Sequence, residues 1–320
     1  VKTVKAFYDA NILRIMHQVH YQTAGHKSLD LVFFINGIPV ATAEVKTEFT
    51  QTVEDAILEY QTERKPIESG TNRKNYLLMF KRGAVVHFAV SEKEIWMCTN
   101  LEPKVPKFLP FNKGCDGHAG NPASDDPEEY PTGYFWNEML QRDNWLRIFH
   151  NFIFVKEERK EDITGRIRTV TTQIFPRYHQ WDCVVKCIDD VKANGVGQRY
   201  LIEHSAGSGK SETLSWIAHE LIRLRDTEGH AKFNSVIVVT DRIGLDNNIK
   251  NTITQLKKTV GLIATIGGDG KHKKTSSSKS KELVEAFREK REIIVVTLQT
   301  FPFALEAIAQ DKNLEGANFA

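Results

Sequence analysis

The first half of the chain alternates short apolar runs with polar turns, a pattern that predicts a compact mixed α/β domain. Residues 30–35 and 38–46 are β-branched and aromatic runs that meet at Asn36-Gly37, which predicts a β-hairpin. Apolar residues at helical spacing predict a helix over residues 52–64. The other elements expected here are strands at 77–80, 84–90 and 94–99 and a helical, aromatic segment at 134–154.

The second half repeats strand and helix in regular order, which predicts a doubly wound parallel sheet. Residues 200–202 are expected to form a short buried strand, followed by a helix over 212–224 that has one apolar face. Two longer apolar runs predict further parallel strands. These runs lie at 233–240 and 293–297, and helices are expected at 181–194 and 282–289.

A charge-dense segment, residues 156–162, separates the two halves and is expected to be a polar linker. The predicted domains are therefore residues 1–158 and 159–320. Two low-complexity stretches are expected to be loops, the glycine-rich 113–122 and the lysine- and serine-rich 267–281. We expect the second loop to be mobile, with lysines that either contact DNA phosphates or are only solvated.

Composition narrows the class of protein. A net charge of +2 over 320 residues gives no strongly basic face, so any nucleic-acid contact must come from local patches. The four cysteines form no C-x-x-C pair, which argues against structural zinc and favours a reducing, cytoplasmic location. No apolar run is long enough to span a membrane, and no signal peptide opens the chain. The chain starts without methionine and stops soon after a predicted strand, so we expect a fragment.

The segment between the predicted strand at 200–202 and its helix has the residue types of a phosphate-binding loop. It contains Gly207, Ser208, Gly209, Lys210 and Ser211 in succession. Glycines let backbone N–H groups close around phosphate oxygens, and the helix N-terminus adds partial positive charge. Lys210 is expected to reach the β- and γ-phosphates, and the Ser211 hydroxyl to bind Mg²⁺. His204 stands where the usual pattern has Gly or Ala, but this change removes no phosphate-binding group.

The register of the predicted hairpin decides whether three polar residues can act together. Glu44 and Lys46 lie on one face of the second strand, because side chains alternate along a strand. A two-residue loop would pair Asp30 with Ala43, whereas a three-residue loop or an equivalent bulge places Asp30 directly opposite Glu44. We predict this second register, in which the two carboxylates are close enough to share a metal ion.

An aspartate followed on the adjacent strand by Glu-x-Lys is the pattern of metal-dependent nucleases of the PD-(D/E)xK type. The carboxylates of Asp30 and Glu44 suit Mg²⁺, which polarises a scissile phosphate and activates water. The Lys46 ammonium is expected to orient that water or to stabilise charge that develops on the phosphate. A salt bridge at a solvated strand end explains the same residues, and the pattern taken alone favours that simpler interpretation.

Several sequence blocks in one order give a more specific resemblance. The blocks are residues 28–46, 51–56, 111–114 with 120–122, 176–180, 200–211, 238–242, 297–299 and 301–302. In these blocks the chain resembles the R subunit of type I restriction–modification enzymes, which carries both a nuclease and a DNA-translocating motor. The resemblance implies an N-terminal PD-(D/E)xK-type nuclease domain followed by the first RecA-like domain of a superfamily 2 motor. It also reverses the preference for a solvated salt bridge.

The resemblance implies roles for the residues of the nuclease half. Asp30, Glu44 and Lys46 become the nuclease residues, with the two carboxylates as metal ligands. A supporting glutamine–tyrosine element on the next helix matches Tyr60. Gln61 is taken as its glutamine, although Glu59 and Ala56 stand where a glutamine is expected.

The resemblance also implies roles in the motor half. Gln180 resembles the glutamine that reads adenine ahead of the phosphate-binding loop, because its amide can both donate to and accept from the adenine edge. Thr240 with Arg242, and the segment 297–299, resemble elements that grip the DNA backbone. A strand-end hydroxyl and a surface arginine explain Thr240 and Arg242 equally well.

The implied function is an ATP- and Mg²⁺-dependent endonuclease and translocase subunit, a type I site-specific deoxyribonuclease that cleaves unmethylated foreign duplex DNA after translocation. Its partners would be methyltransferase (M) and specificity (S) subunits, which recognise the DNA site. Such a motor also needs an Asp-Glu pair on the next strand, and none follows Thr297, so we expect this chain to hydrolyse ATP poorly. Alternatives are a stand-alone nuclease–helicase in DNA repair and a non-catalytic DNA-binding module with a nucleotide switch.

Overall fold

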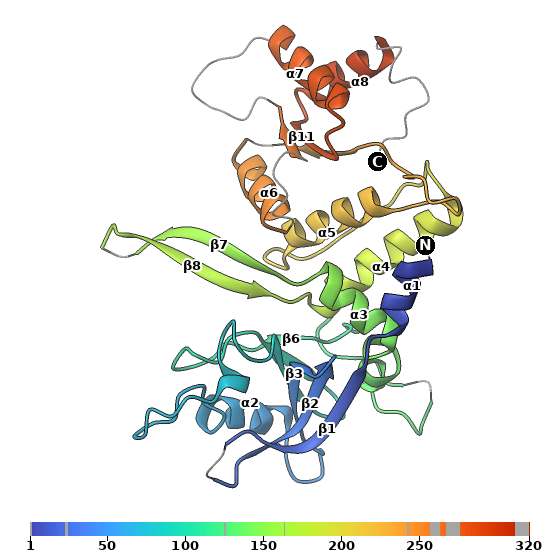
Figure 1. Ribbon diagram of the computed structural model, residues 1–320. Helices are drawn as coiled ribbons and strands as arrows, with labels where there is room; N and C mark the ends of the chain where they lie inside the picture. Colours follow the sequence, from blue (N-terminus) through green and yellow to red (C-terminus); the bar gives the residue numbers. More distant parts are fainter. Residues whose placement is uncertain are drawn as a thin grey trace. The chain divides into compact units, whose positions relative to one another are not determined.

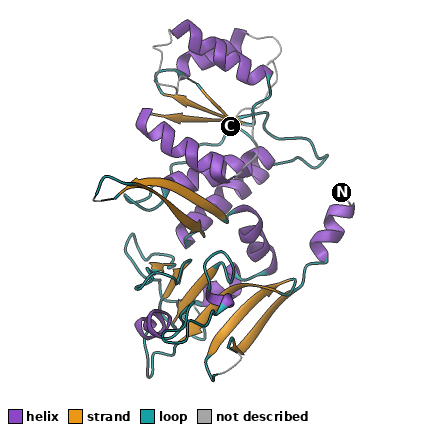
Figure 2. Ribbon diagram, turned by 60° about the vertical axis from the view of Figure 1, so that its left-hand side comes forward, coloured by secondary structure: helices purple, strands orange, loops and turns teal. Residues whose placement is uncertain are grey.

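The computed structural model describes residues 2–22, 25–124, 126–162, 164–241, 243–256, 263–266, 276–310 and 320. The chain divides into two compact units, Val1–His179 and Gln180–Ala320. The division therefore lies after His179 and not near residue 158. The charged segment at 156–162 is not a linker, because it belongs to strand β7 (Phe154–Glu161), which pairs with β8 (Ile167–Ile174) in the long antiparallel ribbon seen in Figure 2.

The first unit begins with helix α1 (Lys2–Asp9) and is built on a six-stranded sheet of order β1-β2-β3-β4-β5-β6 (Figure 1). The strands are β1 (Leu13–His20), β2 (Ser28–Ile35), β3 (Ile38–Val45), β4 (Val86–Val90), β5 (Ile95–Cys98) and β6 (Leu109–Pro110). Neighbouring strands are antiparallel except β3 and β4, which run parallel. The predicted hairpin is confirmed as β2 and β3.

Alternating side chains of the sheet build a core on each of its faces. Helix α2 (Val53–Thr62) packs on one face, where Ala56 and Tyr60 are buried against Val32 and Ala89. The next residues along each strand point to the opposite face, because the side-chain period of a strand is two. There Phe33 and Phe88 meet an aromatic group contributed by the π-helix η2 (Phe135–Met139), helix α3 (Arg142–Asn151) and the end of β8.

One strand expected in this unit is absent. Residues 77–80 were expected to be extended, but Tyr76–Leu78 form a short 3₁₀ helix, η1, in which Leu78 is fully buried. The backbone N–H of Ala84 bonds to the carbonyl of Leu77, so the segment closes a turn and does not join the sheet. A run of four apolar residues carries no period of its own, so it fits a buried turn as well as a strand.

The second unit holds a three-stranded parallel sheet of order β10-β11-β9 with helices on both faces. Side chains of α5 and α6 pack against one face of β9 and β11, and side chains of α7 and α8 pack against the other face. The elements are α4 (Tyr178–Asn194), α5 (Lys210–Arg223), β9 (Val236–Thr240), α6 (Ile243–Leu256), β10 (Ile263–Thr265), α7 (Ser276–Arg288), β11 (Ile293–Thr297) and α8 (Phe301–Gln310). Ala320 also bonds to β9, through Ser235 and Ile237.

Two expectations for this unit need correction. Residues 200–202 form no strand and pair with no described strand, and the Leu201 side chain is 94% exposed. The expected loop at 267–281 is helical from Ser276 onward, whereas residues 267–275 lie outside the described residues. Among the described residues, no helix is both long and apolar enough to cross a membrane.

Candidate active site

A bulge in the β2–β3 hairpin brings the predicted nuclease residues together. Ile35 pairs with Ile38 across a two-residue turn, and Phe34 pairs with Pro39, but Phe33 already pairs with Ala41. One residue, Val40, is therefore extra, and the register shifts by one position from there on. Because Leu31 pairs with Ala43, the next pair along the strands is Asp30 with Glu44. The predicted register is confirmed, with the bulge in place of a longer loop.

Asp30 is held on both sides by neighbouring strands. Its Oδ2 accepts a hydrogen bond from the backbone N–H of Val45 at 2.9 Å. Its Oδ1 accepts one from Nε2 of Gln18 on β1 at 3.1 Å. Gln18 has a positive φ of 49°. This conformation costs a non-glycine residue free energy, and it occurs often at functional sites. Sequence patterns gave no signal for Gln18, because its strand β1 is mostly exposed and carries no motif.

Glu44 is fully buried and forms an ion pair with Arg64. Nε of Arg64, the residue two positions beyond the end of α2, donates to Oε1 of Glu44 at 2.6 Å. The other carboxylate oxygen, Oε2, is buried and has no hydrogen-bond partner among the described residues. Burial raises the pKa of the Glu44 carboxyl, while the Arg64 guanidinium works in the opposite direction. The sequence analysis predicted a helix that ends at Arg64 but assigned this residue no role.

Lys46 follows β3 on the same face as Glu44 and is also buried. Its backbone N–H continues the ladder to Val90, and its Nζ lies 2.9 Å from Oε2 of Glu59 on α2. Glu59 in turn lies 3.9 Å from Nη2 of Arg64. Glu44, Arg64, Glu59 and Lys46 therefore form one chain of alternating charge beside Asp30.

Tyr60 lies next to this group of charged side chains and is not a member of it. Its hydroxyl is 2.8 Å from Oγ1 of Thr42, which is also 2.8 Å from Nδ1 of the buried His87. Gln61 points elsewhere, because its amide donates to the carbonyl of Pro106 at 3.1 Å. The structure therefore brings Asp30, Glu44 and Lys46 together over Tyr60 and leaves Gln61 outside.

The residues present fit a magnesium ion. Mg²⁺ is commonly held by one or two carboxylates and completes its coordination with water and substrate phosphate oxygens. Glu44 offers a buried oxygen that has no hydrogen-bond partner in the described part of the chain, and Asp30 lies opposite it across two paired strands. A closed metal cage is not expected here, and no cluster of three or more metal-binding side chains occurs among the described residues.

The predicted phosphate-binding loop leads directly into helix α5, which begins at Lys210. Gly209 has φ = 86° at the helix N-cap, and a Cβ there would overlap the side-chain amide of Gln180. That amide donates to the carbonyl of Gly209 at 2.9 Å, so the predicted adenine-reading residue lies against the loop. Lys210 Nζ donates to the carbonyls of His204 and Ser205 at 2.9 and 2.8 Å.

Two further predicted positions lie at the carboxyl ends of parallel strands. Thr240 of β9 pairs with Thr297 of β11, so both hydroxyls lie at the sheet edge where ligands of such folds bind. Oγ1 of Thr240 is buried without a hydrogen-bond partner among the described residues. Gln299, in the turn after β11, is exposed. Arg242 lies outside the described residues.

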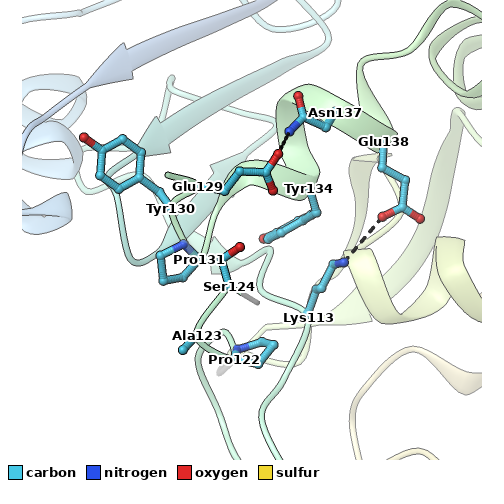
Figure 3. A pocket seen from close by; sticks show the side chains of 10 residues that line it. All are labelled: Lys113, Pro122, Ala123, Ser124, Glu129, Tyr130, Pro131, Tyr134, Asn137 and Glu138. Atoms are coloured by element: carbon cyan, nitrogen blue, oxygen red, sulfur yellow. Dashed lines mark hydrogen bonds and ion pairs between the residues drawn. The ribbon is translucent and has the colours of Figure 1, made fainter. Parts of the chain in front are cut away.

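A cavity of about 310 Å³ lies in the first unit beside the glycine-rich loop (Figure 3). Lys113 extends along the ring of Tyr134 and reaches Glu138 at 3.5 Å, and Asn137 donates to Glu129. None of its lining residues is one of the predicted nuclease residues. Its one lysine is already paired with a carboxylate, so the cavity gives no sign of a phosphate cradle, in agreement with the loop expected from the sequence.

Comparisons with known proteins agree with both halves of this description. Residues 5–105 match the family described as Type I restriction enzyme R protein N terminus. Residues 179–316 match the family described as SWI2/SNF2 ATPase. The first match contains the hairpin carboxylates, and the second contains the phosphate-binding loop.

Individual relatives carry related names at low identity. The chain is 24% identical over 251 residues to the type I restriction enzyme MjaIXP endonuclease subunit of Methanocaldococcus jannaschii, covering 75% of this chain and 22% of the relative. It is 21% identical over 254 residues to the type I restriction enzyme HindI endonuclease subunit of Haemophilus influenzae, covering 76% and 21%. The chain therefore spans about a fifth of the length of these relatives.

Proposed function

We propose, from the confirmed resemblance to R subunits of type I restriction–modification enzymes, that this chain supplies the endonuclease site and the nucleotide-binding half of an ATP-dependent DNA translocase. The substrate is unmethylated foreign duplex DNA, cleaved with Mg²⁺ after translocation. The observation that carries the proposal is the bulged register that sets Asp30 opposite Glu44, with Oε2 of Glu44 buried and without a partner among the described residues.

Each residue of the candidate site has a separate task in this proposal. Asp30 and Glu44 would hold Mg²⁺, and Gln18 and the Val45 N–H fix the orientation of Asp30. When bound, the ion polarises the scissile phosphate and activates water. The Lys46 ammonium donates to the oxygen on which negative charge develops. Glu59 keeps Lys46 in place by the 2.9 Å ion pair.

The nucleotide site needs a local rearrangement before it can accept ATP. Lys210 donates hydrogen bonds to the carbonyls of His204 and Ser205, so these bonds must break before its ammonium group can reach the β- and γ-phosphates. Gln180 must likewise release the carbonyl of Gly209 to contact adenine. Ser211, one residue into α5, then supplies the hydroxyl for the nucleotide-bound Mg²⁺.

Double-stranded DNA and the M and S subunits are the proposed partners. The relatives are named as endonuclease subunits, which supports an assembly in which other subunits recognise the DNA site. A formal charge of only +2 supports the same division of labour, because DNA affinity would then come largely from the partners.

The experiment uses the full-length subunit assembled with its M and S partners. We expect Asp30→Asn and Lys46→Ala to lower plasmid cleavage by at least 100-fold while ATP hydrolysis stays near the wild-type rate. Lys210→Ala should abolish both ATP hydrolysis and cleavage, because translocation precedes cutting. The exposed Glu54→Gln and Lys107→Ala serve as matched controls and should leave both rates unchanged. Wild-type cleavage by the Asp30 and Lys46 variants would show that the hairpin carboxylate and lysine are structural.

A further inference from the structure

Arg64 makes the shortest charged contact in the candidate nuclease site. Its Nε lies 2.6 Å from Oε1 of Glu44, and both side chains are buried, with 10% and 1% of their surface exposed. A buried carboxylate without a partner is costly, and a buried pair persists only where the geometry is good. The guanidinium meets Glu44 through Nε alone, so the contact holds Oε1 by one charge-assisted hydrogen bond.

The contact gives the two oxygens of Glu44 different surroundings. Oε1 is taken by Arg64, whereas Oε2 is buried and has no hydrogen-bond partner among the described residues. A carboxylate can bind a cation through one oxygen or through both. Because Oε1 already accepts a hydrogen bond from Arg64, Oε2 is the oxygen better placed to bind a metal ion.

Arg64 is itself fixed by acidic neighbours. Its Nη1 lies 3.4 Å from Glu63, and its Nη2 lies 3.9 Å from Glu59, the partner of Lys46. Arg64 lies two residues beyond the end of α2, while Glu44 lies on β3, so the contact joins the segment after the helix to the strand that carries the site. A lysine at this position would offer one mobile ammonium in place of a rigid fork.

We propose that Arg64 is a positioning residue for metal binding, which holds Oε1 of Glu44 and thereby presents Oε2 to the divalent cation. This inference rests on the proposed function, because it assumes that Glu44 is a metal ligand. It assigns Arg64 no contact with DNA or with the reacting phosphate.

The test measures binding of Mn²⁺ to the full chain without DNA, by the loss of the free-ion EPR signal. Arg64→Gln should weaken Mn²⁺ binding by at least tenfold, because Oε1 loses its charged partner and the carboxylate can turn. Arg64→Lys should lie between Arg64→Gln and wild type, because it keeps the charge but not the fork. The exposed Arg82→Gln is the matched control and should bind as wild type does. Thermal unfolding shows which variants are folded.

A second readout separates positioning from a merely structural role. In the assembled full-length enzyme, Arg64→Lys should raise the Mg²⁺ concentration for half-maximal cleavage several-fold while leaving the rate at saturating Mg²⁺ within about threefold of wild type. A structural role would instead lower the saturated rate in proportion to the folded fraction and leave the half-maximal Mg²⁺ concentration unchanged.

The outcomes distinguish this inference from the proposal on which it rests. If Glu44→Gln loses Mn²⁺ binding but folded Arg64→Gln binds Mn²⁺ as tightly as wild type, or more tightly, the inference about Arg64 is overturned and the metal site stands. If Glu44→Gln itself binds Mn²⁺ with wild-type affinity, the metal site is wrong, and the inference falls with it.

Discussion

His87 is a buried ionisable group next to the candidate site, and its hydrogen bond to Thr42 connects it to Tyr60. Burial lowers the pKa of its imidazole to about 3, so the ring is neutral in the folded protein at neutral pH. Tyr60 is fully buried, and burial raises the pKa of its phenol well above the usual value. His87 and Tyr60 therefore add no charge next to the proposed metal site.

The depressed pKa of His87 makes stability depend on pH. The unfolded chain binds a proton at His87 below about pH 6.5, the ordinary value, whereas the folded chain does so only near pH 3. The stabilising effect of the neutral ring is therefore complete above pH 6.5 and is lost as the pH falls towards 3. His87→Asn, which can still hydrogen-bond Thr42, should remove the contribution of one titrating proton from the pH dependence of the unfolding free energy.

Urea unfolding between pH 4 and pH 6 measures the effect. The slope of unfolding free energy against pH should be shallower in His87→Asn than in wild type by about 1.4 kcal/mol per pH unit, the value for one proton. Equal slopes would show that His87 titrates alike in the folded and unfolded chains.

At the scale of elements, the tight turn of the hairpin sets the register that the bulge then shifts. Asn36 and Gly37 have φ values of 52° and 80°, the positive angles that a type I′ turn requires. A Cβ on Gly37 would meet no atom within 4 Å, so substitution there changes only backbone energy. Gly37→Ala should destabilise the chain by about 1–2 kcal/mol, the cost of the left-handed conformation for a residue with a Cβ.

Gly37→Asn provides the comparison, because asparagine tolerates this conformation better than alanine does. Urea unfolding should rank the variants as wild type, Gly37→Asn and Gly37→Ala in order of falling stability. If alanine and asparagine cost the same, the turn has another conformation in solution.

The phosphate-binding loop offers a second element-scale test, because two of its glycines differ in their surroundings. Gly207 and Gly209 both have positive φ, but a Cβ on Gly207 meets open space, whereas one on Gly209 displaces the Gln180 amide. Gly209→Ala should therefore cost about 1 kcal/mol more than Gly207→Ala, the value of the Gln180–Gly209 hydrogen bond.

A double-mutant cycle with Gln180→Ala isolates this contact. Gln180→Ala should cost less in the Gly209→Ala background than in the wild type, by about 1 kcal/mol of unfolding free energy. Strict additivity of the two substitutions would mean that Gln180 does not touch the loop.

For the whole molecule, local periodicity predicted the hairpin, helices α2, α4 and α5 and strands β9 and β11, because each has enough apolar residues to define a face. The segment at 200–202 was mistaken for a strand, because three apolar residues say nothing about a hydrogen-bond partner. The charged segment in β7 was mistaken for a linker, because a two-stranded ribbon buries little and can carry charges on both faces.

The candidate site shows the same limit. Asp30, Glu44 and Lys46 were identified because motif and register act over short distances. The partners that hold them come from distant segments, Gln18 from β1 and Arg64 from beyond α2, and no spacing rule connects these positions. Gln61 was misplaced for a related reason, since a single helical step decides which residue of α2 faces the sheet.

The anomalous signal of Mn²⁺ in crystals of this chain tests most directly whether the β2–β3 hairpin builds a divalent-cation site. We expect an anomalous peak between Asp30 and Oε2 of Glu44, with Oε1 still bonded to Arg64. A crystal soaked at saturating Mn²⁺ that shows no peak there, or a peak away from both carboxylates, would contradict the assignment of this hairpin as the nuclease site.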